Sequence, residues 1–206
     1  MRARMALYYA GVTCELREVV LKNKPQEMLA VSAKGTVPVL LLKEQVIDES
    51  LDVMRWALQQ NDPDEWSDVN LDDSLIARND DYFKFYLDRY KYFDRYPEKD
   101  QEYYLQQACV FINELETAIA ISNEGSAWLN GDSLSSVDVA VFPFVRQFAF
   151  VDKNVFNQLP YPKVQQWLAL LLDSDLFQSV MLKYPAWQDG QQTVFFPNKE
   201  LIEATL

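Results

Sequence analysis

The stretch at residues 61–73 is acidic, contains Pro63, and separates two parts of the chain that differ in character. Before it, short helical and short extended patterns alternate, whereas beyond it the patterns are helical throughout. A proline among polar residues between periodic segments is typical of a linker. The sequence therefore predicts an α/β domain at residues 1–62, followed by an all-α domain at residues 72–206.

The first part predicts six short elements, in the order helix, strand, helix, strand, strand, helix. Their expected positions are residues 2–10, residues 14–21, a helix starting at Pro25, a hairpin of residues 37–42 and 45–47, and a helix from Glu49. The hairpin should turn at Lys43 and Glu44. Gly11 should end the first helix, because glycine tolerates the left-handed backbone of a helix C-terminus.

The second part contains four segments with a helical period, at roughly residues 73–95, 99–122, 135–150 and 164–172. Residues 135–150 place their apolar side chains on one stripe. This segment begins with the spacing of a capping box, in which Ser135 bonds a first-turn amide and Asp138 replaces the usual glutamate. We assign both residues to folding rather than catalysis. Pro143 should kink the helix or remove one backbone hydrogen bond.

The chain has no histidine, and this limits its chemistry. Ser-His-Asp and Cys-His catalysis are excluded, and zinc loses its commonest ligand. Two isolated cysteines, Cys14 and Cys109, cannot form a thiolate cage for a metal. We therefore expect no metal, and we expect any chemistry to depend on a bound cofactor or cosubstrate, or on carboxylates, hydroxyls or tyrosines.

The formal net charge is −12, from 19 basic and 31 acidic residues. Such a surface repels phosphate backbones and anionic lipid, so we expect neither nucleic acid nor a membrane as a partner. The sequence shows no signal-peptide pattern and no apolar stretch of transmembrane length. Two isolated cysteines give no disulfide framework, so the expected location is the cytoplasm.

The cysteines do not have the surroundings of an activated thiol. Cys109 lies among apolar residues and is expected in the core. Cys14 stands at the entrance of a strand, with no cationic neighbour in the sequence beyond Arg17. We therefore expect neither to be held as a thiolate.

Three stretches of the first part are candidates for binding a ligand, and each has a purely structural alternative. The first is Thr36-Val37-Pro38-Val39, where a proline enters a strand. A cis bond before Pro38 would leave the Val37 backbone free to pair with an extended peptide. The alternative is an ordinary proline at a strand start.

The second and third candidates flank helix starts. Asp48-Glu49-Ser50 opens the helix after the hairpin, where free amides, the helix dipole and the Ser50 hydroxyl suit a carboxylate. Glu49 would pair with an ammonium, so the stretch would hold the charged pair of an amino acid; the alternative is helix capping. Lys24, beside Pro25, opposes the helix dipole. This position indicates either a contact with a carboxylate ligand or a side chain that is simply solvated.

In their order and spacing, these segments resemble the cytosolic glutathione transferases, in particular the bacterial, omega-like members of the cysteine type. The resemblance covers nearly the whole chain, and no single motif carries it. The motifs are Asn23-Lys24-Pro25, Lys34-Gly35-Thr36-Val37-Pro38-Val39-Leu40, Asp48-Glu49-Ser50-Leu51, Trp128-Leu129-Asn130-Gly131-Asp132, Ser135 to Asp138, and Phe142-Pro143-Phe144-Val145-Arg146-Gln147-Phe148.

The resemblance implies a thioredoxin-like domain that binds glutathione, joined to an all-α domain that supplies a hydrophobic site for an electrophile. It implies a cis peptide at Pro38, with Val37 pairing its backbone with the cysteinyl part of glutathione. Glu49 and Ser50 would hold the γ-glutamyl ammonium and carboxylate, and Lys24 would contact the tripeptide. Glutathione would be the cosubstrate, and a homodimer is expected by analogy.

Family members begin with a strand and a loop that carries a catalytic Cys, Ser or Tyr, followed by a helix that resembles residues 2–7. We therefore expect a thioredoxin-like domain truncated at its N-terminus, with the true start upstream of Met1 and no catalytic residue carried over. The expected function is conjugation or reduction of a hydrophobic electrophile with glutathione. The alternative is a non-catalytic binding or regulatory protein of the same fold, inactive because the catalytic loop is absent.

Overall fold

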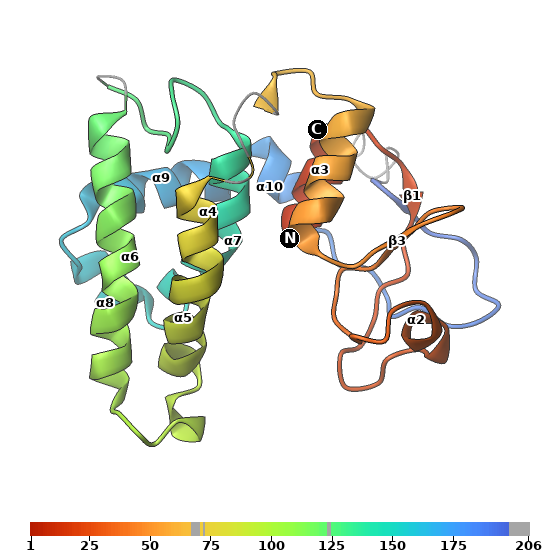
Figure 1. Ribbon diagram of the computed structural model, residues 1–206, viewed down its shortest axis with the longest axis horizontal. Helices are drawn as coiled ribbons and strands as arrows, with labels where there is room; N and C mark the ends of the chain where they lie inside the picture. The colour runs from red at the N-terminus through yellow and green to blue at the C-terminus, as the bar shows by residue number, and fades with distance from the viewer. Residues whose placement is uncertain (67–70, 72, 123–124, 198–206) are drawn as a thin grey trace. The chain divides into compact units, whose positions relative to one another are not determined.

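The computed structural model describes residues 1–66, 71, 73–122 and 125–197 (Figure 1). The chain forms two compact units. The N-terminal unit combines residues 1–64 with the segment that begins at Ser174, and the helical unit comprises residues 65–173. The sequence predicts a helical domain over residues 72–206, whereas the helical unit of the structure ends at Asp173. Part of the predicted linker, at residues 67–70 and 72, lies outside the described residues, as do residues 198–206.

The first six elements of the N-terminal unit have the order that the sequence predicted. They are α1 (Arg2–Tyr9), β1 (Cys14–Glu15), α2 (Gln26–Val31), β2 (Leu40–Leu41), β3 (Val46–Ile47) and α3 (Ser50–Gln60). The segment from Ser174 adds α10 (Asp175–Val180) and β4 (Phe195–Phe196). Gly11 follows α1 with a φ of +66°, which confirms the expected glycine stop.

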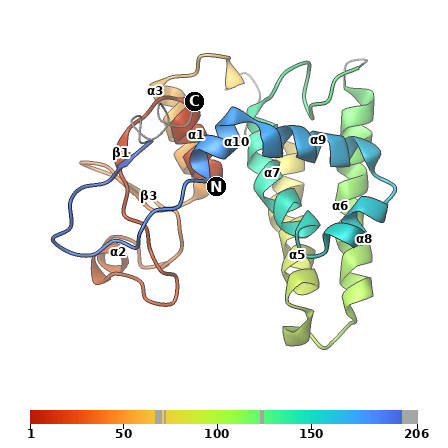
Figure 2. The same cartoon turned by 180° about the vertical axis from the view of Figure 1, so that it is seen from behind.

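The core of the N-terminal unit lies where α1 packs on α3, and α10 covers α1 from another side (Figure 2). The contact is made by small and flexible apolar side chains, all fully buried, among them Met5, Ala6, Met54 and Ala57. Alanines at a helix contact let the two backbones approach closely. The end of α3 is held by Tyr9, whose hydroxyl donates to Asp62 (2.9 Å) and accepts from the Asp64 amide (2.8 Å).

Two separate two-stranded ladders complete this unit. In the first, β2 and β3 run antiparallel with Leu40 opposite Ile47, and the Leu42 amide donates to the Gln45 carbonyl at 2.8 Å. This confirms the predicted hairpin with its turn at Lys43 and Glu44.

The second ladder pairs β1 with β4 from the other end of the chain, so that Cys14 lies opposite Phe196. The predicted strand at residues 14–21 is regular only at Cys14–Glu15, because β4 offers a partner of only two residues. The flanking segments are still joined, by hydrogen bonds from the Leu16 amide to Val194 and from the Trp187 amide to Glu18. The C-terminal segment therefore belongs to the N-terminal unit through its backbone.

The helical unit is built around two long antiparallel segments. One comprises α4 (Ser74–Arg78), a π-helical turn (Asn79–Phe83) and α5 (Lys84–Lys91), followed by a 3₁₀ turn (Phe93–Arg95). The other is α6 (Gln101–Ile121), which packs along α5 (Figure 1). The remaining elements are α7 (Ser136–Ala149), α8 (Lys153–Gln158) and α9 (Pro162–Asp173). Phe83 joins these layers, with its ring 4.9 Å from that of Phe111 and 5.6 Å from that of Phe148.

The start of α7 confirms the predicted capping box. Asp138 is fully buried, and its carboxylate accepts hydrogen bonds from the Leu129 amide (2.9 Å), the Trp167 indole (2.8 Å) and the amide and hydroxyl of Ser135 (2.9 and 2.6 Å). One carboxylate thus joins α7, α9 and the loop before α7. The helix continues through Pro143. Within the described residues, no helix combines the length and apolarity that crossing a bilayer requires.

Candidate functional site

The five residues predicted to bind glutathione all lie in the N-terminal unit, around the β2–β3 hairpin and α3. The pairing of Leu40 with Ile47 closes the hairpin ladder at its open end. The segment of Val37 to Val39 enters the ladder at this end, and the segment of Asp48 to Ser50 leaves it at the same end. The hairpin therefore brings two of the three candidate stretches to the same place, although neither lies in a strand.

Val37 lies in an exposed bend at this place. The Val37–Pro38 peptide is cis, as the resemblance implied, and the side chain of Val37 is 48% exposed. Within the described part of the chain, no group hydrogen-bonds to the Val37 backbone. Its N–H and C=O are the groups that an extended peptide would pair with when it adds alongside a strand.

The start of α3 bears on the capping interpretation of Glu49. Glu49 precedes the first turn with an extended backbone (φ −111°, ψ 134°), and its side chain accepts no hydrogen bond from the helix. Its carboxylate instead accepts from the ammonium of Lys34, at 2.7 Å. Capping therefore does not account for Glu49, and the first turn of α3, which begins at Ser50, has amides that this residue leaves unsatisfied.

Asp48 lies beside Glu49 and makes two strong contacts. It accepts hydrogen bonds from the ammonium of Lys34 (2.9 Å) and from the hydroxyl of Ser32 (2.8 Å). These two donors, Lys34 first, hold the pKa of the Asp48 carboxyl below its usual range. Asp48 is thus ionised at neutral pH and is already partnered within the chain.

Lys24 reaches the same region from the segment before α2. Gly35 has a φ of +60°, and a Cβ at this position would lie 3.7 Å from the Lys24 ammonium. The side chain of Lys24 therefore lies against the loop that leads to Val37. The structure thus places Lys24 against Gly35, two residues before Val37, and joins Glu49 to the same loop through Lys34.

Sequence reasoning missed Ser32 and Lys34, which join the loop after α2 to the start of α3. Both sit in a segment without periodicity, so no local pattern indicates where their side chains point. The opposite charges of Lys34 and of the Asp48-Glu49 pair are the only signal available. These opposite charges indicate a contact only once the fold has placed the two segments next to each other.

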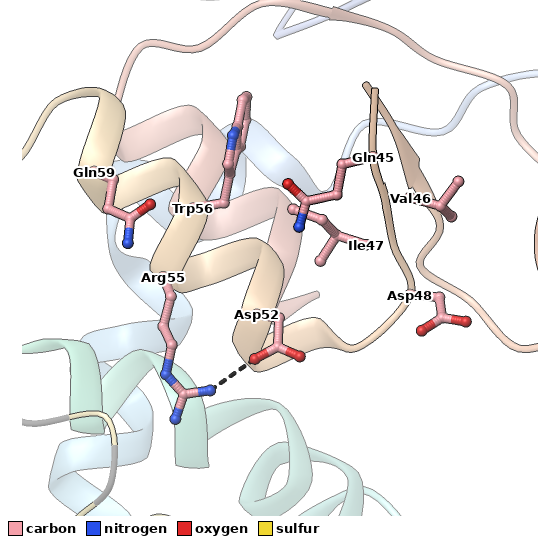
Figure 3. A pocket seen from close by; sticks show the side chains of 8 residues that line it. All are labelled: Gln45, Val46, Ile47, Asp48, Asp52, Arg55, Trp56 and Gln59. Carbon is pink, nitrogen blue, oxygen red and sulfur yellow. Dashed lines mark hydrogen bonds and ion pairs between the residues drawn. The ribbon is translucent and has the colours of Figure 1, made fainter. Parts of the chain in front are cut away.

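A cavity of about 320 Å³ lies between β3 and α3, on the side of the hairpin where Trp56 projects (Figure 3). Its lining residues are Gln45, Val46, Ile47, Asp48, Asp52, Arg55, Trp56 and Gln59. Arg55 and Asp52, both on α3, form an ion pair along one wall, with 2.8 Å between Nη1 and Oδ1. The cavity shares Asp48 with the candidate site, but its walls are mostly polar, so it offers poor burial for a hydrophobic electrophile.

The two thiols do not add a nucleophile to this arrangement. Burial raises the pKa of Cys14, and the nearby Arg4 only partly opposes this effect. Burial also raises the pKa of Cys109 to about 11. Both results agree with the expectation that neither cysteine is held as a thiolate. Among the described residues, no group of acidic or cysteine side chains is arranged to hold a metal ion.

Comparison with known proteins gives two matches to family models. Residues 1–66 match the N-terminal domain of the glutathione S-transferases, and residues 81–173 match their C-terminal domain. Among curated proteins, the chain is similar to glutathione S-transferase omega-1 of Rattus norvegicus. The two are 25% identical over 199 residues, which cover 91% of this chain and 78% of the rat protein.

Solved structures show the same fold. A glutathione S-transferase-I bound with lactoylglutathione superposes with a TM-score of 0.67 at 20% identity, covering 87% of this chain and 91% of that one. A glutathione transferase family member from Pseudomonas fluorescens, with two glutathione molecules bound, gives 0.68 at 16% identity, covering 87% and 86%. The predicted fold class, a thioredoxin-like domain followed by a helical domain, is confirmed.

Proposed function

Since the chain belongs to the glutathione S-transferase family, we propose that it binds glutathione at the opening of the β2–β3 hairpin. We further propose that it conjugates a small hydrophobic electrophile with glutathione or reduces it. The family and its fold support a glutathione-binding transferase function in general. The residue assignments and the choice of reaction are our own proposal.

The observation that carries the proposal is the Val37 backbone, which is unpaired among the described residues and lies at the same end of the hairpin as the start of α3. An extended tripeptide that pairs its cysteinyl part with this backbone would direct its γ-glutamyl end toward Ser50. There its γ-glutamyl carboxylate would meet the Ser50 hydroxyl and the first-turn amides of α3. The γ-glutamyl ammonium would meet the carboxylate of Glu49. Lys24, lying against Gly35, would contact a carboxylate of the same ligand.

The chemistry required is to lower the pKa of the glutathione thiol, because the thiolate is the nucleophile. Contacts of the tripeptide with charged side chains and backbone amides of the chain would orient it for this step. We assign no catalytic residue. Cys14 and Cys109 are unsuited to the role because burial raises the pKa of each thiol.

The partners and location follow the same proposal. We propose a homodimer by analogy with the family, and a cytoplasmic location, in keeping with Cys14 and Cys109 as free thiols. The net charge of −12 disfavours nucleic acid and anionic membranes as partners. A small hydrophobic electrophile is the proposed second substrate.

A non-catalytic binding or regulatory role is the second candidate. It is favoured by one observation, namely that neither thiol of the described residues is activated. Such a protein would still bind glutathione at the same place, so binding and turnover have to be measured separately.

Thermal unfolding with and without millimolar glutathione tests the binding step. A ligand present at ten times its Kd stabilises the folded state by about 1.4 kcal/mol, so we expect a higher Tm for the chain and a smaller rise for Glu49→Gln. No change in Tm at saturating glutathione would contradict the proposal. Turnover of a chromogenic aryl halide would then favour the enzyme, and binding without turnover the second candidate.

A further inference from the structure

Lys34 bridges the two carboxylates that precede α3. Its ammonium lies 2.9 Å from Asp48 and 2.7 Å from Glu49. The proposed function gives the carboxylate of Glu49 to the γ-glutamyl ammonium of the ligand. In the structure, one oxygen of that carboxylate, Oε1, is already occupied by a cation of the chain itself.

The two cations are chemically alike. A lysine ammonium and an amino-acid ammonium each carry one positive charge and three N–H donors, with no acceptor. Two such groups on one carboxylate would repel each other at short range. The ligand ammonium and the Lys34 ammonium therefore compete for Glu49.

The two carboxylates differ in how firmly they hold Lys34. The Asp48 side chain is only 24% exposed and also accepts a hydrogen bond from Ser32, whereas the Glu49 side chain is 61% exposed. Exposed ion pairs are weak and exchange partners readily. Lys34 can thus leave Glu49 and keep its contact with Asp48.

We infer that Lys34 is a built-in competitor for the amino group of the ligand, occupying Glu49 in the ligand-free chain and giving it up when the γ-glutamyl ammonium binds. This inference rests on the proposed function. It makes Lys34 a specificity-determining residue, because only ligands that carry the amino group have to displace it. A ligand without that group leaves the Lys34–Glu49 pair intact.

The test compares Lys34→Gln with the wild-type chain by calorimetric titration at low salt. Lys43→Gln is the matched control, because it removes the same charge from an exposed position in the turn of the same hairpin. Two ligands are used, namely glutathione and its analogue with hydrogen in place of the α-amino group. Circular dichroism confirms that each variant is folded.

For Lys34→Gln we expect glutathione to bind about threefold more tightly than to the wild-type chain, the scale of an exposed ion pair. Lys43→Gln should leave the Kd unchanged, and the deamino analogue should bind the wild-type chain and Lys34→Gln equally. In a Glu49→Gln background the gain from Lys34→Gln should vanish, because the contested carboxylate is gone.

Each other outcome is decisive. If the wild-type chain binds glutathione and Lys34→Gln binds it no more tightly, the inference is overturned while the proposed function stands. Lys34→Gln could tighten the binding of the deamino analogue by the same factor, or could still tighten glutathione binding in a Glu49→Gln background. In either case the competition is not for the amino group, and the inference is overturned. If neither the wild-type chain nor any variant binds glutathione, the proposed function fails and the inference fails with it.

Discussion

Cys14 and Phe196 are cross-strand partners in an antiparallel ladder, although they come from opposite ends of the sequence. The ladder is short, but Phe196 is fully buried, and the amides of Leu16 and Trp187 extend the contact beyond the Glu15–Phe195 pair. The C-terminal segment is therefore part of the N-terminal unit rather than an appendage of the helices.

A chain that ends at Val180 should lose stability in its N-terminal unit. The truncation removes the hydrogen bonds to Leu16 and Glu18 and exposes the apolar surface that Phe196 covers. Hydrogen exchange of the amides near Cys14 should become much faster, while exchange in α6 stays the same. A chain that ends at Pro197 is the matched control and should retain protection. Unchanged exchange near Cys14 in the shorter chain would show that the ladder contributes nothing.

Arg4 should contribute measurably to the stability of the N-terminal unit. Its guanidinium pairs with Glu18 and lies 5.6 and 5.7 Å from the ring centroids of Tyr184 and Phe196. Arg4→Met should lower the free energy of unfolding by about 1–2 kcal/mol, as expected for a partly desolvated cation–π contact with an ion pair.

The control for Arg4 is Arg17→Met. Arg17 pairs with Glu15 and lies 4.8 Å from the Trp187 ring centroid, but its side chain is half exposed. We expect a loss of less than about 0.5 kcal/mol for this variant. Urea denaturation measures both, and equal losses would mean that burial of Arg4 does not matter.

Asp138 should dominate the stability of the helical unit. Replacing it by alanine leaves the Leu129 amide, the Trp167 indole and the Ser135 amide without their buried acceptor. Each unsatisfied buried donor costs about 1–3 kcal/mol, so Asp138→Ala should lose about 3–5 kcal/mol after relaxation. Asp132→Ala, at an exposed position of the preceding loop, is the control and should be close to neutral. A small loss for Asp138→Ala, measured by urea denaturation, would contradict the structural role.

The thiols should react slowly with an alkylating agent at pH 8. Burial raises the pKa of Cys14 and raises the pKa of Cys109 to about 11, so the reactive thiolate is a minor species of each at this pH. Alkylation should accelerate as the pH rises further into the alkaline range and should be fast in denaturant at pH 8. Stability should fall over the same alkaline range, because a raised folded-state pKa favours folding only while the thiol stays protonated. Rapid alkylation of the native chain at pH 7 would show that a thiol is activated after all.

The features that the sequence predicted correctly depend on residues close to one another. The hairpin at Lys43 and Glu44 follows from two short apolar runs and the polar turn between them. The capping box of Ser135 and Asp138 spans a single helical turn. Such patterns are visible in a window of a few residues.

The features that escaped prediction depend on segments far apart in the sequence. Residues 181–193 are largely irregular, so nothing local indicates that β4 will pair with β1, and strand pairing depends on context more than on propensity. For the same reason the sequence placed residues 174–206 with the helices. At the candidate site, the sequence pointed to Glu49 as a charged ligand contact or a cap. The tertiary structure was needed to show that Lys34 is its partner.

Glutathione binding at the opening of the β2–β3 hairpin is tested most directly by titrating glutathione into ¹⁵N-labelled chain and following the backbone amides by NMR. The amides of Val37, Ser50 and Lys24 should show saturable shifts, and those of α6 should show none. Shifts that are absent at millimolar glutathione, or that gather in the helical unit instead, would contradict it.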